Sequence, residues 1–159
     1  MPKISAILHT SNDAQRIGRA LESLRPCDEV VVIDHDSTDG TAEVARKQGA
    51  TVRTRIAGVK PGAYVHDLSH DWVLSLQPNE ALSESLEASL LEWKQGEEPP
   101  PDVLGYCIAV REETENGWKS ADQQFRLANR CRINWTEALP PDVANGQALA
   151  GEVLRFKKP

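Results

Sequence analysis

The chain has 159 residues, of which 24 are acidic, 18 are basic and 40% are hydrophobic, and its formal net charge is −6. A chain of roughly 150 residues buries about 68–70% of its unfolded surface, so we expect one globular domain over residues 1–159 rather than a disordered chain. The acidic balance excludes a dedicated nucleic-acid-binding protein, which needs basic side chains to neutralise phosphates.

Membrane insertion and export are also not expected. The longest apolar run, residues 106–110, is far shorter than the roughly 20 residues of a membrane-spanning helix. The first ten residues hold no apolar segment of about 7–15 residues before a small-residue cleavage site, so we expect no signal peptide. Three cysteines without CxxC spacing, Cys27, Cys107 and Cys131, are typical of reduced thiols and predict a cytoplasmic location.

The residues up to position 54 alternate between strand and helix patterns. Short aliphatic and β-branched runs predict strands at residues 3–9, 30–33 and 51–54. An apolar stripe at spacings of three and four predicts a helix after the first strand, with Ser11 or Asn12 as its N-cap. This order predicts right-handed crossovers and a parallel sheet, with a ligand site at the carboxyl ends of the strands.

Three carboxylates follow the second predicted strand in the sequence DHDSTDGT. Asp34, Asp36 and Asp39 lie within six residues and repel one another unless a cation or a donor-rich ligand joins them. Alternatively, Asp34 and Asp36 brace the loop while Thr38 and Asp39 cap the next helix, for which Ser37 is a second candidate cap. The local sequence leaves both interpretations open.

The second half begins with a predicted strand at residues 72–76 and a helix, capped by Ser83, that ends near Gln95. The segment GEEPPPD at residues 96–102 cannot continue that helix, because its three prolines remove backbone donors and fix an extended chain.

The remaining residues predict an antiparallel addition to the same domain. Strands at 103–111 and 118–127 flank Asn116 and Gly117, a pair that favours a type I′ hairpin turn. The tail from residue 155 to residue 159 is expected to fray.

Taken together, these segments resemble the family 2 glycosyltransferases. The polar loop after the first strand and the acidic Ser-Thr-Asp-Gly-Thr loop stand in family order, followed by similar segments at 71–83, 122–130 and 134–137. The resemblance implies a GT-A fold, which is a Rossmann-like three-layer α/β sandwich with a mainly parallel central sheet and a C-terminal antiparallel hairpin. Residues 1–95 would form the nucleotide-binding half and residues 103–156 an extension on the acceptor side.

The resemblance also implies roles for individual residues. Thr10 and Asn12 would flank the nucleotide base, and Asp34 would accept a hydrogen bond from a base N–H, with Asp36 in the same nucleotide-binding loop. Glu137 falls where relatives place an acidic residue near the acceptor. It would act as general base in an inverting displacement.

Gln77 and Asn79 depart from the family pattern. They stand where the family has an Asp-x-Asp pair that holds a divalent cation on the donor diphosphate. Amide oxygens are neutral and Glu80 alone does not replace the pair, so we expect the Mn²⁺ or Mg²⁺ site to be degraded and assign no metal ligand. Both amides remain candidates for donor contacts.

The resemblance thus predicts transfer of a sugar from a nucleotide-sugar to an unidentified carbohydrate or lipid-linked acceptor, without a metal or with activity impaired. One alternative is a nucleotide-sugar or carbohydrate-binding module without catalysis. Another follows from DHDST, which matches the DxDxT signature of haloacid-dehalogenase-like phosphatases, with Asp34 as nucleophile and Asp36 as acid/base beside Mg²⁺. That family also needs a later acidic pair after a strand, and residues 77–80 do not supply one.

Overall fold

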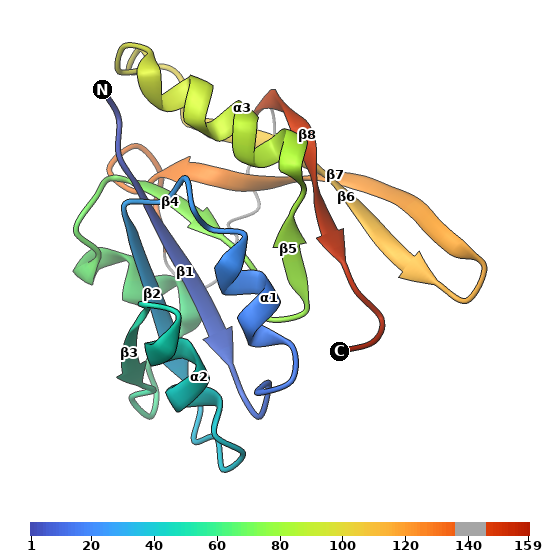
Figure 1. Cartoon of the computed structure of the whole chain (residues 1–159). Helices are drawn as coiled ribbons and strands as arrows, with labels where there is room; N and C mark the ends of the chain where they lie inside the picture. Colours follow the sequence, from blue (N-terminus) through green and yellow to red (C-terminus); the bar gives the residue numbers. More distant parts are fainter. Residues whose placement is uncertain (136–145) are drawn as a thin grey trace.

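The computed structural model describes residues 1–135 and 146–159, which form a curled sheet with the strand order β3-β2-β1-β4-β7-β6-β8-β5 (Figure 1). The strands are β1 (Ile4–Thr10), β2 (Glu29–Asp34), β3 (Thr51–Thr54), β4 (Trp72–Ser75), β5 (Glu80–Leu82), β6 (Gly105–Thr114), β7 (Gly117–Asn129) and β8 (Gln147–Arg155). The pairs β1–β2, β1–β4, β2–β3 and β6–β8 are parallel, and β4–β7, β6–β7 and β5–β8 are antiparallel. This confirms the predicted α/β fold with a mainly parallel sheet and an antiparallel hairpin.

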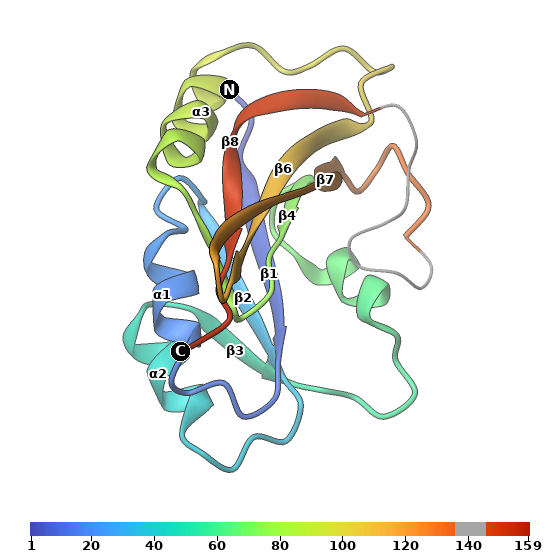
Figure 2. The same ribbon diagram turned by 90° about the vertical axis from the view of Figure 1, so that its right-hand side faces the viewer.

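Helices cover both faces of the sheet. Figure 2 shows α1 (Ile17–Glu22), α2 (Thr41–Lys47) and α3 (Glu84–Gln95) on one face and the 3₁₀ helix η1 (Pro61–Asp67) on the other. The alternation along β1 explains the three layers, because Ile4, Ala6 and Leu8 join the core under α1–α3 while Ile7 joins the core under η1. In the part of the chain that the structure describes, no helix has the length and apolar character to span a membrane.

Both crossover helices begin later than the sequence predicted. The expected caps at positions 11–12 and 37–38 are wrong, because α1 begins at Ile17 and α2 at Thr41. The polar side chains at those positions bond across to the neighbouring loop instead of to their own helix. The end of α2 follows the prediction, since Gly49 takes the positive φ of 87° that suits a residue after a helix.

The hairpin of β6 and β7 is longer than predicted, and its turn differs from the expected type. A type I′ turn requires positive φ at both central residues, yet of the two proposed turn residues only Gly117 has it, at 111°. Thr114 closes the turn through its hydroxyl group, which accepts from the Asn116 N–H at 3.3 Å and donates to the Gly117 carbonyl at 2.7 Å.

Two strands, β5 and β8, were not predicted. β8 lies parallel to β6 and antiparallel to β5, and it passes so close to α3 that a Cβ at Gly151 would meet the Leu86 backbone at 2.5 Å. The predicted fraying from residue 155 is wrong, because Arg155 ends β8 and the Phe156 N–H donates to the Asn79 carbonyl at 2.8 Å.

Candidate functional site

The loops after β1 and β2 form one polar surface at the carboxyl edge of the sheet. The two strands end side by side, with Thr10 paired to Asp34. The Asn12 N–H donates to Ser37 Oγ at 2.9 Å, and the Thr38 N–H donates to Asn12 Oδ1 at 2.8 Å. The Ser37 hydroxyl in turn donates to Asp34 Oδ1. These contacts tie the predicted base-binding residues Thr10, Asn12 and Asp34 into a single surface.

Two further carboxylates, Asp13 and Asp39, hold the loops of this surface together. Asp13 accepts from the Thr10 hydroxyl at 2.6 Å, and its own N–H donates to Thr41 Oγ1 at 2.9 Å. Asp39 accepts from the Ala14 and Thr41 N–H groups, each at 3.1 Å. The Thr41 hydroxyl and these N–H donors lower the pKa of Asp39 below its usual value. Asp39, predicted as a cap of the next helix, does accept from the first N–H of α2, and its bond to Ala14 also holds the two loops together.

Asp34 and Asp36 have different surroundings, although only one residue separates them. Asp34 is half-buried at the strand end, and its backbone carbonyl accepts from the Arg55 N–H at 2.9 Å. Asp36 has a left-handed φ of 56°, is 67% exposed, and lies 2.9 Å from Arg55 Nη2. Arg55 was missed by the sequence interpretation. Its one signal is its position directly after the third strand.

A histidine pair next to Asp34 was also missed. His9 Nδ1 lies 2.8 Å from His35 Nε2, so one ring nitrogen donates and the other accepts. The His9 ring also packs edge-on against Tyr64 at a centroid distance of 5.3 Å. Burial, followed by the charge of His35, lowers the pKa of His9 to about 4. The His9 ring is therefore neutral at physiological pH.

The predicted cation loop, Gln77 to Glu80, leaves the same edge of the sheet after β4. β4 is the parallel neighbour of β1, so this loop lies two strands away from Asp34. Gln77 is exposed and Asn79 is half-exposed. Glu80, in contrast, is fully buried and accepts from the Gln77 N–H at 2.9 Å.

Two arginines form salt bridges with the Glu80 carboxylate. Arg126, itself buried, donates to both Glu80 oxygens at 2.7 and 2.8 Å. Arg155 lies 2.9 Å from Oε2 and also pairs with Glu112. Burial alone would raise the pKa of Glu80, but the hydrogen bonds and charges of Arg126, with help from the Gln77 N–H and Arg155, outweigh it and lower the pKa.

The residues present in this loop do not fit a divalent cation. Hard cations need charged oxygen ligands, whereas Gln77 and Asn79 offer neutral amides and the Glu80 oxygens face Arg126 and Arg155. The predicted general base, Glu137, lies outside the described residues, and its role stays a prediction.

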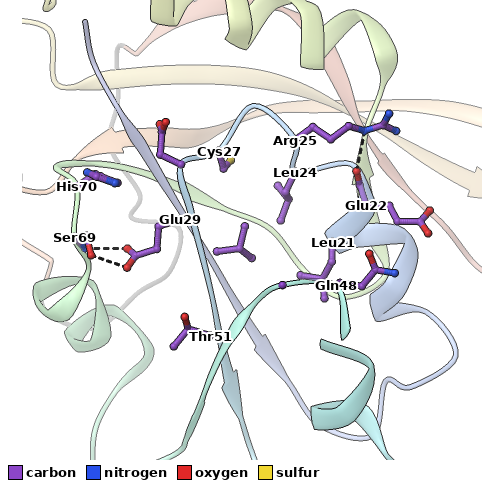
Figure 3. A pocket seen from close by; sticks show the side chains of 13 residues that line it. Leu21, Glu22, Leu24, Arg25, Cys27, Glu29, Gln48, Thr51, Ser69 and His70 are labelled. Carbon is purple, nitrogen blue, oxygen red and sulfur yellow. Dashed lines mark hydrogen bonds between the residues drawn. The ribbon is translucent and has the colours of Figure 1, made fainter. Parts of the chain in front are cut away.

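A pocket of about 870 Å³ lies at the opposite edge, where the parallel strands begin (Figure 3). Glu29 at the start of β2, Thr51 at the start of β3 and His70 before β4 contribute to its lining. The Glu29 carboxylate is already bonded to the Ser69 N–H at 2.9 Å and to its hydroxyl at 2.7 Å. The pocket is therefore separate from the carboxyl-edge surface. The Glu29 carboxylate in its lining holds Ser69 in place and so stabilises the fold.

Comparisons with known proteins agree with this geometry, although no family model matches the chain. An uncharacterized glycosyltransferase from Rickettsia felis is 38% identical over 135 residues, which cover 82% of this chain and 47% of that protein. The lipopolysaccharide core biosynthesis glycosyltransferase LpsC from Rhizobium meliloti is 29% identical, covering 99% of this chain and 65% of that protein. A crystal structure of a mycobacterial protein shares the fold, with a TM-score of 0.53 and 20% identity, covering 72% of this chain and 43% of that one.

The chain therefore spans about half the length of the first of these curated relatives and about two thirds of the second. The chain is a family 2 glycosyltransferase-like protein with a GT-A fold.

Proposed function

We propose that the chain binds a nucleotide-sugar at the carboxyl edge of β1 and β2 and transfers its sugar to a carbohydrate or lipid-linked acceptor. The observation that carries the proposal is the position of Asp34, which is half-exposed at a strand end, with one carboxylate oxygen held by Ser37. An oriented carboxylate in that place suits a base N–H donor. The name of the relative from Rhizobium meliloti supports an acceptor in the lipopolysaccharide class.

Thr10, Asn12 and Asp36 would complete the base subsite, and Gln77 and Asn79 would lie toward the diphosphate. We further propose that donor binding needs no divalent cation, because Glu80 is already engaged by Arg126. The free cysteines Cys27, Cys107 and Cys131 support the expected cytoplasmic location.

A thermal-shift screen tests donor binding. The wild-type protein is heated with nucleosides, nucleoside diphosphates and nucleotide-sugars, each in EDTA and in Mn²⁺. A ligand at 100 times its Kd should stabilise the fold by roughly 2.7 kcal/mol. Stabilisation in EDTA by one nucleotide-sugar is the expected result, and no response to any member of the panel would overturn the proposal.

Glu137→Gln separates transfer from binding alone. If Glu137 is the general base, this variant should bind the donor normally and transfer sugar about 10²–10⁴-fold more slowly. An unaltered transfer rate would refute the role of Glu137. If the wild type binds the donor but shows no transfer, and Glu137→Gln is silent in every assay, the binding-module alternative is correct.

The phosphatase alternative has its own signature. It requires Mg²⁺-dependent hydrolysis of a generic phosphomonoester by the wild type and loss of that activity in Asp34→Asn. The structure gives this alternative little support, because the Asp36 carboxylate, its acid/base group, is paired with Arg55 at 2.9 Å.

A further inference from the structure

The carboxyl-terminal strap, which we define as residues 155–159, runs along the carboxyl edge between the two parts of the proposed donor site. At its start, the Phe156 N–H donates to the carbonyl of Asn79 in the cation loop. At its end, Pro159 lines a cavity of about 310 Å³ together with Asn12 and Asp39 of the base-side loops. Figures 1 and 2 both place the carboxyl terminus beside the loop that leads into α1.

Arg19 of α1 holds the strap in place. Its guanidinium carbon lies 3.5 Å from the centroid of the Phe156 ring, and its Nη2 donates to the Lys158 carbonyl at 3.1 Å. Trp118 contacts the same Phe156 ring edge-on, with the centroids 5.3 Å apart. A cation over an aromatic ring is favourable when both are partly desolvated. These contacts explain why the strap is ordered, although its sequence predicts fraying.

Positive charge remains available on this strap. Among the described residues, neither Arg19 nor Lys158 forms a salt bridge, and Lys157 pairs only with Glu115, a carboxylate that is 84% exposed. An exposed pair of that kind contributes little and exchanges readily.

The carboxylates around the strap leave these cations accessible. Glu113 lies near enough to raise the pKa of Arg19, although burial, the larger effect, lowers it overall. Asp13 is committed to Arg16, and Asp39 accepts from two backbone N–H groups and the Thr41 hydroxyl. The strap is therefore a short cationic segment beside a loop whose own cation site has lost its carboxylates.

We propose that Arg19, Lys157 and Lys158 bind the diphosphate of the donor and supply the positive charge for which the loop at Gln77 and Asn79 no longer holds a divalent cation. This inference rests on the proposed function. In an inverting transfer, the acceptor oxygen forms its bond to the anomeric carbon while the bond from that carbon to the diphosphate oxygen breaks. The electron pair stays on the diphosphate and the acceptor proton passes to a base. Fixed cations beside the diphosphate stabilise the charge that develops there.

The test compares nucleosides with their diphosphates in EDTA. Calorimetry with matched pairs (uridine and UDP, guanosine and GDP, cytidine and CDP, adenosine and ADP, thymidine and dTDP) separates the base subsite from the diphosphate subsite. For the nucleotide that binds, Lys157→Gln with Lys158→Gln should weaken diphosphate binding at least tenfold and leave nucleoside binding unchanged. Arg19→Gln should act in the same direction. In the double variant, the fall in diphosphate affinity with added salt should become shallower.

Arg46→Gln with Lys47→Gln is the matched control, because it removes the same charge from the exposed end of α2, at the other edge of the sheet. Diphosphate binding that the strap variants leave unchanged, or that requires Mn²⁺, would overturn this inference while the proposed function stands. Tighter binding in the strap variants would show that the strap blocks the site, which also overturns it. A wild-type protein that binds no nucleoside, diphosphate or nucleotide-sugar would overturn the proposed function itself.

Discussion

Two loops leave the same edge of the sheet, and they use their carboxylates in opposite ways. In the loop after β2, Asp34 is half-buried and Asp36 is largely exposed, and their partners are one hydroxyl group and one exposed arginine. In the loop after β4, Glu80 is fully buried and bound by Arg126 and Arg155.

This difference shows that a carboxylate marks a ligand site only while part of its acceptor capacity remains open. Glu80 begins β5, Arg126 comes from β7 and Arg155 from the end of β8, so the Glu80 carboxylate ties together three strands of the antiparallel half of the sheet. The Asp34 carboxylate, in contrast, accepts from Ser37 of its own loop, and Ser37 in turn accepts from the Asn12 N–H of the neighbouring loop. The carboxylates of the first loop are therefore suited to bind a ligand, whereas Glu80 at the end of the second loop is a structural joint between strands.

Glu80→Gln should give the largest effect of any single change, because it leaves the buried Arg126 guanidinium without a counter-charge. Breaking a buried ion pair by removing one partner costs about 3–5 kcal/mol. The free energy of unfolding in urea measures the loss. Glu112→Gln is the matched control, since it removes the more exposed partner of Arg155, and it should cost less than about 1 kcal/mol. Equal losses in the two variants would contradict the role of Glu80 as a joint.

Asp34→Asn should have the next largest effect, on ligand affinity and not on the fold. The amide oxygen still accepts from Ser37, so the two loops keep their contact. A charge-assisted hydrogen bond to the nucleotide base is lost, which costs about 1.5–3 kcal/mol, or roughly 10- to 100-fold in Kd. Calorimetry with the nucleotide from the thermal-shift screen measures this change. Asp67→Asn, a charge-matched change at an exposed carboxylate on η1, should leave the Kd unaltered.

Much of the parallel half could be predicted, because β1, β2 and β4 contain short apolar runs and the apolar stripe of the first helix is clear. The strand β5 has three residues, and β8 has the weakly apolar sequence QALAGEVLR with mostly exposed or half-exposed side chains. Their pairing depends on partners far away in the chain, which local patterns do not reveal.

The candidate site shows the same division. Asp34 was found from its position at the end of a predicted strand, and Gln77 from the resemblance to the family. The engagement of Glu80 could not be predicted, because Arg126 lies 46 residues away and reaches it only in the folded sheet. The pairing of His9 with His35 likewise requires the parallel register of β1 and β2.

Restoring the two family aspartates should give the cation loop carboxylates that are free to bind a ligand, as in the loop after β2. Gln77→Asp with Asn79→Asp places two charged oxygen ligands on a loop where Glu80 stays engaged by Arg126. We expect Mn²⁺ to tighten nucleoside diphosphate binding about tenfold in this variant, roughly 1.4 kcal/mol, and to have no effect on the wild type. Titration of both proteins in Mn²⁺ and in EDTA checks this. Tight Mn²⁺ binding by the wild type would show that our interpretation of the loop is wrong.

A pH dependence of the free energy of unfolding should again separate the two loops. The pKa of His9 falls from 6.5 to about 4, through burial first and then the charge of His35. Between these values the unfolded chain binds a proton that the folded chain does not, so the free energy of unfolding falls as pH drops from about 6.5 to about 4. The pKa of Glu80 is lowered as well, and its contribution is lost only as pH falls through that lowered value, below 4.5.

Mild acid should therefore weaken the base-side loops before it reaches the Glu80 joint. His9 faces His35 and Tyr64, and the carboxylates of Asp34 and Asp36 flank His35 in the chain. Protonation of the buried His9 ring places a positive charge against His35. His9→Asn keeps a polar group near Nδ1 but does not titrate. Urea unfolding at several pH values between 4.5 and 7 should give a shallower pH dependence for His9→Asn than for the wild type. The other titrating groups are common to both proteins, so the difference isolates His9. Identical slopes would show that the histidine pair does not couple the nucleotide-side loops to pH.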